Sequence, residues 1–415
     1  MKNKIHMAER ILFTVIVLAV NIILCNIPVP GLDGDYMKTW FSLSSALGFA
    51  DTLSGGAMSS MGIAGFGISS YITATIVLQL LAVAFPALDQ GKRGEHGRKT
   101  MQKVSVLLSM VITLAGAVVF AVASGGTSQP LNAVLAVVCW LFGTFIVVTL
   151  ALKVEDYGVG NGVSLVLMSN ILSCVPEQLY NAVYISADKV KTAIIFAVLF
   201  CVLYLIVAFL QKGVLNIPLI QSQKPASVFN DTAVLPIPVN VSNVLPVVYA
   251  SVILALPAMV VALGGIKVNH IVEEILMVSS SSNWYRPAHW YYSLGIVIYL
   301  LLVWFFCRVS SKLAFQSAEV ADRMKRAGDV IEGIAPGPQT IAYLERRRKI
   351  MAGIGFLFLS AVSIVPDLIC SLAGIQQVHF LGTSMIIVCG VISTMWLEIK
   401  AARIRSHKRY RLFSV

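Results

Sequence analysis

The chain has 415 residues, of which 57% are hydrophobic and only 12% are charged. A soluble domain carries roughly 25% charged residues, so this composition excludes a globular protein in water and indicates a chain surrounded mostly by lipid. The formal net charge of +11 does not indicate nucleic-acid binding, because the basic residues cluster between hydrophobic segments.

Ten hydrophobic segments are candidates for membrane-spanning helices, which need about 20 apolar residues each. In chain order they are residues 11–27, 66–86, 103–123, 132–152, 163–176, 190–211, 243–262, 288–308, 350–366 and 379–399. The first segment is assigned as a span and not as a signal peptide, because no cleavage-site pattern follows it. We therefore expect an all-α membrane protein with ten transmembrane helices.

The distribution of lysine and arginine predicts which loops face the cytoplasm. If the N-terminus is cytoplasmic and the spans alternate, 26 of the 31 Lys and Arg residues fall on the cytoplasmic side. The two largest basic groups then lie between spans eight and nine and after residue 400. We therefore expect a multi-pass protein of the plasma membrane with both termini in the cytoplasm.

The interiors of the ten spans contain essentially no ionisable side chain. Ion-coupled transporters need such groups at mid-membrane, and intramembrane hydrolases need a catalytic dyad or metal ligands there. No G-x-x-x-x-G-K-[ST] phosphate-binding motif occurs. The seven cysteines are single and widely spaced, which indicates small buried residues and no metal site. We therefore expect a passive conduit or a scaffold, and neither an enzyme nor a cofactor.

Short motifs occur in a fixed order at the ends of these spans. They are RILFT and IPVPGLD (10–14 and 27–33), SGGAMSSMGIAGFGISSYITATIVLQLL (54–81), GVGNGVSL (158–165), LPIPVNVSNVLPVVYAS (235–251), GIAPGPQTIAYLERR (333–347) and FLGTSMIIV (380–388). With these motifs the chain resembles, over nearly its whole length, the SecY family of protein translocase channel subunits. The resemblance implies two inverted, pseudo-symmetric halves, residues 1–176 and 177–415, and a pore that passes unfolded polypeptides across the membrane or laterally into it.

The resemblance also implies which residues form the pore and its seal. A ring of aliphatic side chains suits a pore of this kind, because it is dry when closed and deforms around any passing chain. The implied ring is Ile72, Ile76, Leu167, Ile171, Val248 and Ile387. The implied plug, a short helix that closes the pore from outside, is 54–65, and it begins with Ser54, Gly55, Gly56, Ala57 and Met58. From the residues alone, ordinary packing or lipid-facing positions explain the ring residues better, because aliphatic side chains fill every span, and only the resemblance selects these six.

The second and seventh spans would form a lateral gate toward the lipid. The implied gate residues are Thr75, Gln79, Ser251 and Leu256, although polar residues in spans are also common as helix–helix contacts. The cytoplasmic loops 211–243 and 309–349 would dock a motor protein. The implied docking residues are Lys224, Ala335, Arg346 and Arg347, although the arginines also serve to set orientation.

Three sites depart from the family pattern. Loop 211–243 carries only Lys212 and Lys224, Ala335 stands where the family has arginine, and Asn21 precedes Ile22 where the family often has an aromatic residue followed by arginine. These departures resemble the accessory SecY paralogue of Gram-positive bacteria, which exports glycosylated serine-rich surface proteins. The implied partners are a SecE-like single-span subunit, a SecA-type ATPase, the secreted preprotein and membrane lipid, without nucleic acid.

Three alternatives stay open on the sequence. A housekeeping SecY channel would carry the same pore motifs. A small-solute secondary transporter would need a polar binding site at mid-membrane. An insertase or assembly scaffold without a through-pore would not become permeable to ions when residues 54–65 are removed.

Overall fold

The computed structural model describes residues 7–30, 51–85, 94–121, 130–185, 189–221, 233–241, 244–264, 270–279, 284, 290–372, 383–384, 386–396 and 399–400. Within these ranges, six helices are long and apolar enough to cross a membrane. Four shorter apolar helices coincide with the remaining predicted spans. All ten predicted spans are therefore confirmed as helices.

The helices fall into two successive groups. The first group is α1 (Met7–Asn26), α4 (Gly67–Ala84), α6 (Gly94–Ala121), α7 (Pro130–Tyr157) and α8 (Gly162–Ile185). The second group is α9 (Lys189–Lys212), α10 (Leu245–Gly264), α12 (Leu294–Ala314), α14 (Pro338–Leu372) and a last helix, Ile386–Trp396. Shorter elements join them, namely α11 (His270–Ser279), η4 (Trp290–Ser293) and α13 (Ser317–Ala327).

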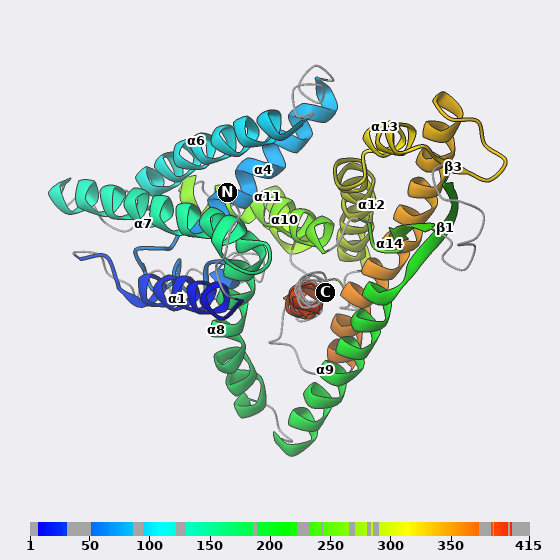
Figure 1. The fold of residues 1–415 in the computed structure, drawn as a ribbon. Helices are drawn as coiled ribbons and strands as arrows, with labels where there is room; N and C mark the ends of the chain where they lie inside the picture. Colours follow the sequence, from blue (N-terminus) through cyan, green and yellow to red (C-terminus); the bar gives the residue numbers. More distant parts are fainter. Residues whose placement is uncertain are drawn as a thin grey trace.

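Figure 1 shows how these groups are arranged. Most helices of the first group lie on the left, α9, α12 and α14 lie on the right, and α8 and α9 approach each other at the bottom. Helix α10 lies in the centre, where it contacts α4 and α6 of the first group. The last helix lies between the two groups, so the centre of the molecule is lined by helices from both parts of the chain.

Helix α8 is longer than the segment 163–176 that we predicted, and it continues through Pro176 to Ile185. The apolar run is interrupted by Glu177, which made the helix look shorter in the sequence. The outer part is an aromatic face, with the rings of Tyr180 and Tyr184 stacked at 5.6 Å. Such a face suits the interface between membrane and water.

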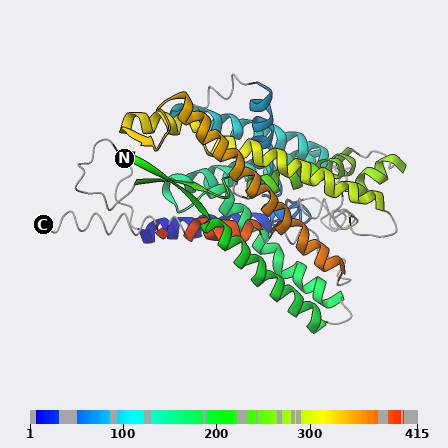
Figure 2. The ribbon, with the colours of Figure 1, turned by 90° about the vertical axis from the view of Figure 1, so that its right-hand side faces the viewer.

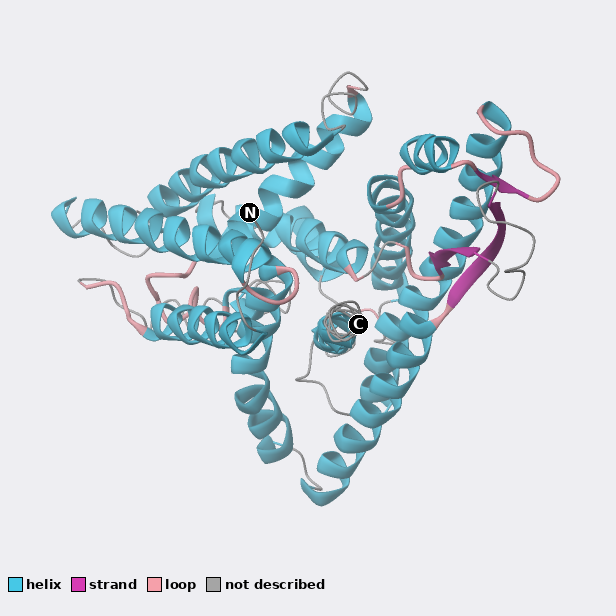
Figure 3. Cartoon of the chain, viewed as in Figure 1, coloured by secondary structure: helices cyan, strands magenta, loops and turns pink. Residues whose placement is uncertain are grey.

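A three-stranded antiparallel sheet adds to the predicted helices (Figure 3). Strand β1 (Val214–Gln221) lies between β2 (Ala233–Pro238) and β3 (Asp329–Ile331). Figure 2 shows the sheet, α13 and the start of α1 at one end of the bundle, and the approach of α8 to α9 at the other. The described parts of loops 211–243 and 309–349 thus lie at the same end as the start of α1, as an alternating path requires.

The outer edge of β2 carries two prolines. The backbone N–H of Val239 donates to the Gly213 carbonyl at 2.9 Å. Because backbone N–H groups alternate along a strand, those of residues 233, 235 and 237 face β1, and positions 234, 236 and 238 face outward. Pro236 and Pro238 have no N–H to offer, so Val234 is the only donor of β2 on that edge.

One buried arginine connects two helices beneath this sheet. Arg348 of α14 is 5% exposed, and its Nη1 donates to the Ser311 hydroxyl of α12 at 2.8 Å. Its Nη2 lies 3.4 Å from Oε1 of Glu345. This arginine, which sequence reasoning counted only as part of a basic cluster, thus holds α12 and α14 together.

The cysteines only partly follow the expectation of small buried residues. Cys25, Cys307, Cys370 and Cys389 are buried, and Cys139 and Cys174 are half-buried. Cys201 is exposed on α9, which corrects the prediction for that residue. Its face of the helix is apolar, so the sequence could not distinguish a buried side from a lipid-facing one.

Candidate pore and plug

The six predicted ring residues come from four helices. Ile72 and Ile76 lie one turn apart on α4, and Leu167 and Ile171 do so on α8. Val248 lies on α10, and Ile387 on the last helix. All six are at most 3% exposed and belong to a single hydrophobic cluster. The structure therefore buries all six predicted ring residues in a large hydrophobic cluster that both groups of helices share.

Residues 51–58, which contain the start of the predicted plug 54–65 and which we call the tip, pack into the same cluster. Residues 51–54 are helical and are followed by the left-handed glycines Gly55 and Gly56, with φ of 75° and 77°. Leu53 and Ala57 are buried members of the cluster that contains the ring. The tip thus lies against the candidate pore, where the family resemblance places a seal.

Asp51 organises the tip internally. Its Oδ1 accepts a hydrogen bond from the Ser59 backbone N–H at 2.8 Å, and its carbonyl accepts one from the Ser54 hydroxyl at 2.8 Å. Burial raises the pKa of the Asp51 carboxyl, while hydrogen bonds from Ser59, Met58 and Ser54 act in the opposite direction. Asp51 thus bonds the start of the tip both to Ser54 within it and to Ser59, the residue that follows it.

Residues 59–66, which we call the stem, are fixed to the chain that follows α1. The Val29 N–H donates to the Met61 carbonyl at 2.9 Å, and the Ile63 N–H donates to the Ile27 carbonyl at 2.9 Å. The indole N–H of Trp140 on α7 donates to the Gly62 carbonyl at 3.0 Å. The stem is thus anchored mainly through its backbone.

An aromatic group supports the end of the stem. The Phe66 ring lies 5.4 Å from Phe120 of α6 and 5.6 Å from Trp140 of α7, with both pairs edge to face. This geometry is favourable for aromatic pairs. Met58 and Met61 belong to the same buried cluster, so the stem rests on α6 and α7.

The contact between α4 and α10 includes a side-chain hydrogen bond across the predicted lateral gate. The Gln79 amide nitrogen of α4 donates to the Tyr249 hydroxyl of α10 at 3.0 Å. Thr75 also reaches the Tyr249 hydroxyl with its side chain, and the hydroxyls of Thr75 and Ser251 donate to carbonyls of their own helices, those of Ile72 and Val247. Sequence reasoning missed Tyr249, whose position beside Val248 was the available signal.

Leu256, the fourth predicted gate residue, is 39% exposed on α10. It therefore lies on the outside of the bundle and not in the contact with Tyr249. Its exposure fits a position at the lipid side of the seam, because apolar side chains face hydrocarbon without cost.

The predicted docking residues are partly described. Ala335 is exposed, and its carbonyl accepts a hydrogen bond from the Thr340 hydroxyl at 3.0 Å. Arg346 is exposed, and the Arg347 guanidinium lies 5.1 Å from the centre of the Tyr343 ring. Lys224 lies outside the described residues. The structure thus places three of the four residues around the start of α14.

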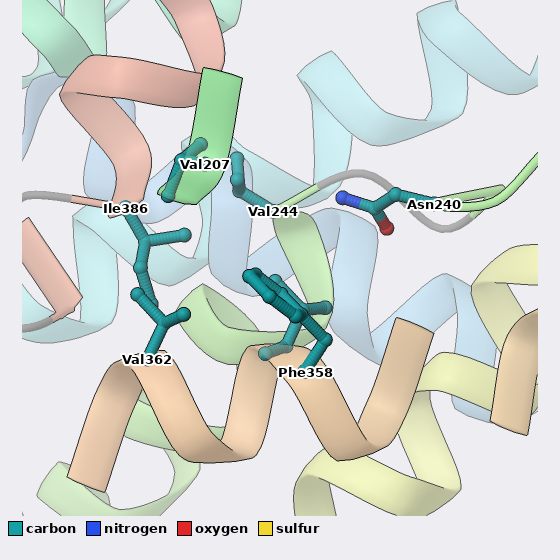
Figure 4. Close-up of a pocket in the computed structure, with 7 residues that line it drawn as sticks. Val207, Asn240, Val244, Phe358, Val362 and Ile386 are labelled. Carbon is teal, nitrogen blue, oxygen red and sulfur yellow. The ribbon is translucent and has the colours of Figure 1, made fainter. Parts of the chain in front are cut away.

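A small pocket lies between α9, α10, α14 and the last helix (Figure 4). Its free volume is only about 10 Å³, and six apolar side chains and one amide line it: Val207, Asn240, Val244, Phe358, Leu359, Val362 and Ile386. Binding sites for small molecules usually measure about 300–1,000 Å³ and contain several converging polar groups. This pocket therefore gives no support to the small-solute transporter alternative.

Comparisons with known proteins agree with this arrangement. The sequence model of the SecY family matches residues 62–396. A relative from Synechococcus elongatus, "Protein translocase subunit SecY", is 30% identical over 403 residues, which cover 92% of this chain and 89% of the relative. A relative of the same name from Thermus thermophilus is 29% identical over 409 residues, which cover 93% of this chain and 90% of the relative.

A solved structure with the same fold is described as a protein conducting channel. It has a TM-score of 0.69 and 17% identity, with 97% of this chain and 94% of that chain covered. The solved structures in this group have ten transmembrane helices in two halves. The fold of this chain is therefore the same ten-helix arrangement.

Proposed function

The chain belongs to the SecY family and is a protein translocase channel subunit, and we propose that its pore is the ring of six aliphatic residues. The observation that carries this proposal is their convergence from four helices into one buried cluster, against which the plug tip packs. A ring of this chemistry makes no lasting bond to a passing chain and excludes ions when closed.

The proposed route has two exits. An unfolded polypeptide crosses the ring once the tip has moved, and an apolar segment leaves between α4 and α10 into lipid. The bond between Gln79 and Tyr249 supports the second exit, because a hydrogen bond between helices in a membrane contributes only about 0.6 kcal/mol on average. A seam held in this way opens at small cost.

We propose that a partner protein supplies the energy for transport. The chain has no phosphate-binding motif of the Walker type, so we propose a SecA-type ATPase that docks at loops 211–243 and 309–349. A SecE-like single-span subunit would hold the two halves together. With the N- and C-termini in the cytoplasm of a plasma-membrane protein, the docking loops face the motor.

We further propose the accessory type of this channel, which exports glycosylated serine-rich surface proteins. Its support is the exposed Ala335, where the family pattern has arginine, together with the few basic residues in loop 211–243. A housekeeping channel would bind the general motor. The test measures the affinity of the purified channel for the general motor and for the accessory motor. Tight binding of the general motor alone would contradict the accessory assignment.

Site-specific crosslinking tests the pore. Cysteines replace Ile72, Ile171 and Ile387 one at a time in a cysteine-free background, and a polypeptide is arrested during translocation. We expect crosslinks at these three positions and none at cysteines replacing Leu107 or Leu205, which are 69% and 66% exposed on α6 and α9. Crosslinks only at the two exposed positions would show that the pore assignment is wrong.

Deleting residues 54–65 distinguishes a channel from a scaffold. A channel without its plug is expected to conduct ions in a lipid bilayer, because the ring alone closes less tightly. A scaffold without a through-pore would stay impermeable. The measurement is the conductance of the full chain and of the deletion in planar bilayers under the same voltage.

A further inference from the structure

Two buried asparagines connect the plug tip to α1 and α8. The Asn170 amide nitrogen of α8 donates to the Leu53 carbonyl at 2.8 Å. The Asn21 amide nitrogen of α1 donates to the Asn170 Oδ1 at 2.6 Å. Asn21 and Asn170 are 2% and 3% exposed, so this chain of hydrogen bonds is inaccessible to water while the tip is in place.

These bonds lie at the carboxyl end of the short helix in the tip. Residues 51–54 form a helical turn whose last carbonyls have no partner within the helix, as at any helix end. Asn170 satisfies the carbonyl of Leu53, and the Cys25 thiol lies 3.4 Å from the carbonyl of Ser54. Side chains of α8 and α1 thus cap the tip helix, and the tip must give up both contacts when it leaves.

The pair also contains a spare acceptor. Among the described residues, Oδ1 of Asn21 is buried without a hydrogen-bond partner. It belongs to the amide group whose nitrogen already bonds Asn170. When the Leu53 carbonyl departs, rotation of the Asn170 amide lets its nitrogen donate to this oxygen. The pair therefore has one hydrogen-bonded arrangement with the tip in place and a second one without it.

We propose that Asn21 and Asn170 form an amide latch, which holds the plug tip closed and re-pairs internally when the tip moves. This inference rests on the proposed function, since a latch has a role only if the tip opens a pore. A departing carbonyl enters water and an amide nitrogen finds a new acceptor, so neither group is left unpaired. The latch therefore resists opening while leaving the barrier low enough for a polypeptide to displace the tip.

Thiol labelling measures the latch without any transport. Cys174 of α8 lies under the tip, since a Cβ added at Gly56 would be 3.7 Å from its sulfur. The full chain retains Cys174 as its single cysteine, with Cys25 changed to serine, in lipid nanodiscs. Because Cys174 is half-buried with the tip in place, the increase in its rate of labelling by a membrane-impermeant maleimide, relative to the chain with both asparagines, reports how often the tip moves away.

We expect Asn170→Ala to raise the labelling rate about tenfold, which corresponds to one buried hydrogen bond. The matched control is Asn26→Ala, whose amide bonds the Ile22 carbonyl of its own helix and does not touch the tip. Asn21→Ala should not raise the labelling rate and should lower it, because it removes one hydrogen bond of the closed arrangement and both bonds of the re-paired one. Asn170→Gln, which displaces the amide by one methylene, serves as a second variant if Asn170→Ala does not fold.

Two results would overturn the latch. The first is a Cys174 labelling rate in Asn170→Ala and Asn170→Gln that equals the rate in Asn26→Ala. The second is an increase in the labelling rate that is as large for Asn21→Ala as for Asn170→Ala. Failure of the proposed function has a different signature, namely no ion conductance after deletion of residues 54–65. The two failures are thus distinguished by separate measurements.

Discussion

The stem and the tip of the plug are neighbours in sequence, but different kinds of contact fix them. The stem is bonded through its backbone to residues 27–29 and through Gly62 to Trp140. The tip is bonded to other helices through the side chains of Asn170 and Cys25. Backbone pairing persists as long as the fold does, whereas a side chain can rotate to another partner. Because the backbone N–H groups of Ser60 and Gly62 donate to the carbonyls of Gly56 and Ala57, the tip also stays bonded to the stem, and its bonds to α8 and α1 are the ones that a side-chain rotation can break.

The largest expected effect comes from Gly62→Val in the stem. A Cβ at this position would lie 2.2 Å from the Cys25 carbonyl oxygen, and no rotation of a side chain relieves a clash with backbone. We expect loss of the folded stem, seen as a lower thermal midpoint in detergent and a permanent ion leak. Gly353→Val on α14 is the control, because nothing lies within 4 Å of its added Cβ.

Phe66→Ala should have the next largest effect on stability. It removes a ring that is 5% exposed and packs on Phe120 and Trp140, and such truncations cost about 3–5 kcal/mol. Thermal unfolding is the measurement, with Phe142→Ala as the control at a site that is 64% exposed. Equal midpoints for the two variants would contradict the anchoring role of the stem.

Trp140→Phe tests a single bond of the stem. The ring is retained, and the Gly62 carbonyl loses the indole donor but keeps the Gly65 backbone N–H at 2.9 Å, so the cost is that of one hydrogen bond, about 0.5–1.5 kcal/mol. We expect a modest fall in the thermal midpoint. Trp396→Phe, at a position 67% exposed, should leave the midpoint unchanged.

Ser54→Ala should give the smallest effect, and we expect it in the labelling rate of Cys174 and not in the thermal midpoint. Its hydroxyl accepts from the Met58 N–H at 3.1 Å and donates to the Asp51 carbonyl, so its loss weakens the tip by about 1 kcal/mol. We expect faster labelling of Cys174 with no shift of the thermal midpoint. A shift of the midpoint without faster labelling would mean that the tip and the stem respond as one unit.

The sequence predicted the ten helices because lipid imposes a length and a composition that are visible in any window of about 20 residues. It did not predict strands β1 and β2, because their prolines at positions 218, 236 and 238 are typical of turns. Pairing with each other, and not local propensity, makes these segments strands.

The candidate site likewise has a part that the sequence predicted and a part that it did not. The six ring residues were selected by motif, and their burial could not be read from aliphatic spans in which every position looks alike. The contact of Asn170 with Leu53 joins residues 117 positions apart, and the role of Tyr249 depends on how α4 lies beside α10. These contacts arise from packing between helices, which hydropathy does not encode.

The prolines on the outer edge of β2 affect how an extended polypeptide can pair with this sheet. A polypeptide awaiting transport is extended, and extended chains add readily to an open sheet edge. With Pro236 and Pro238 facing outward, this edge offers a single N–H donor from the strand, that of Val234. This edge therefore favours the addition of another strand less than an edge without proline does.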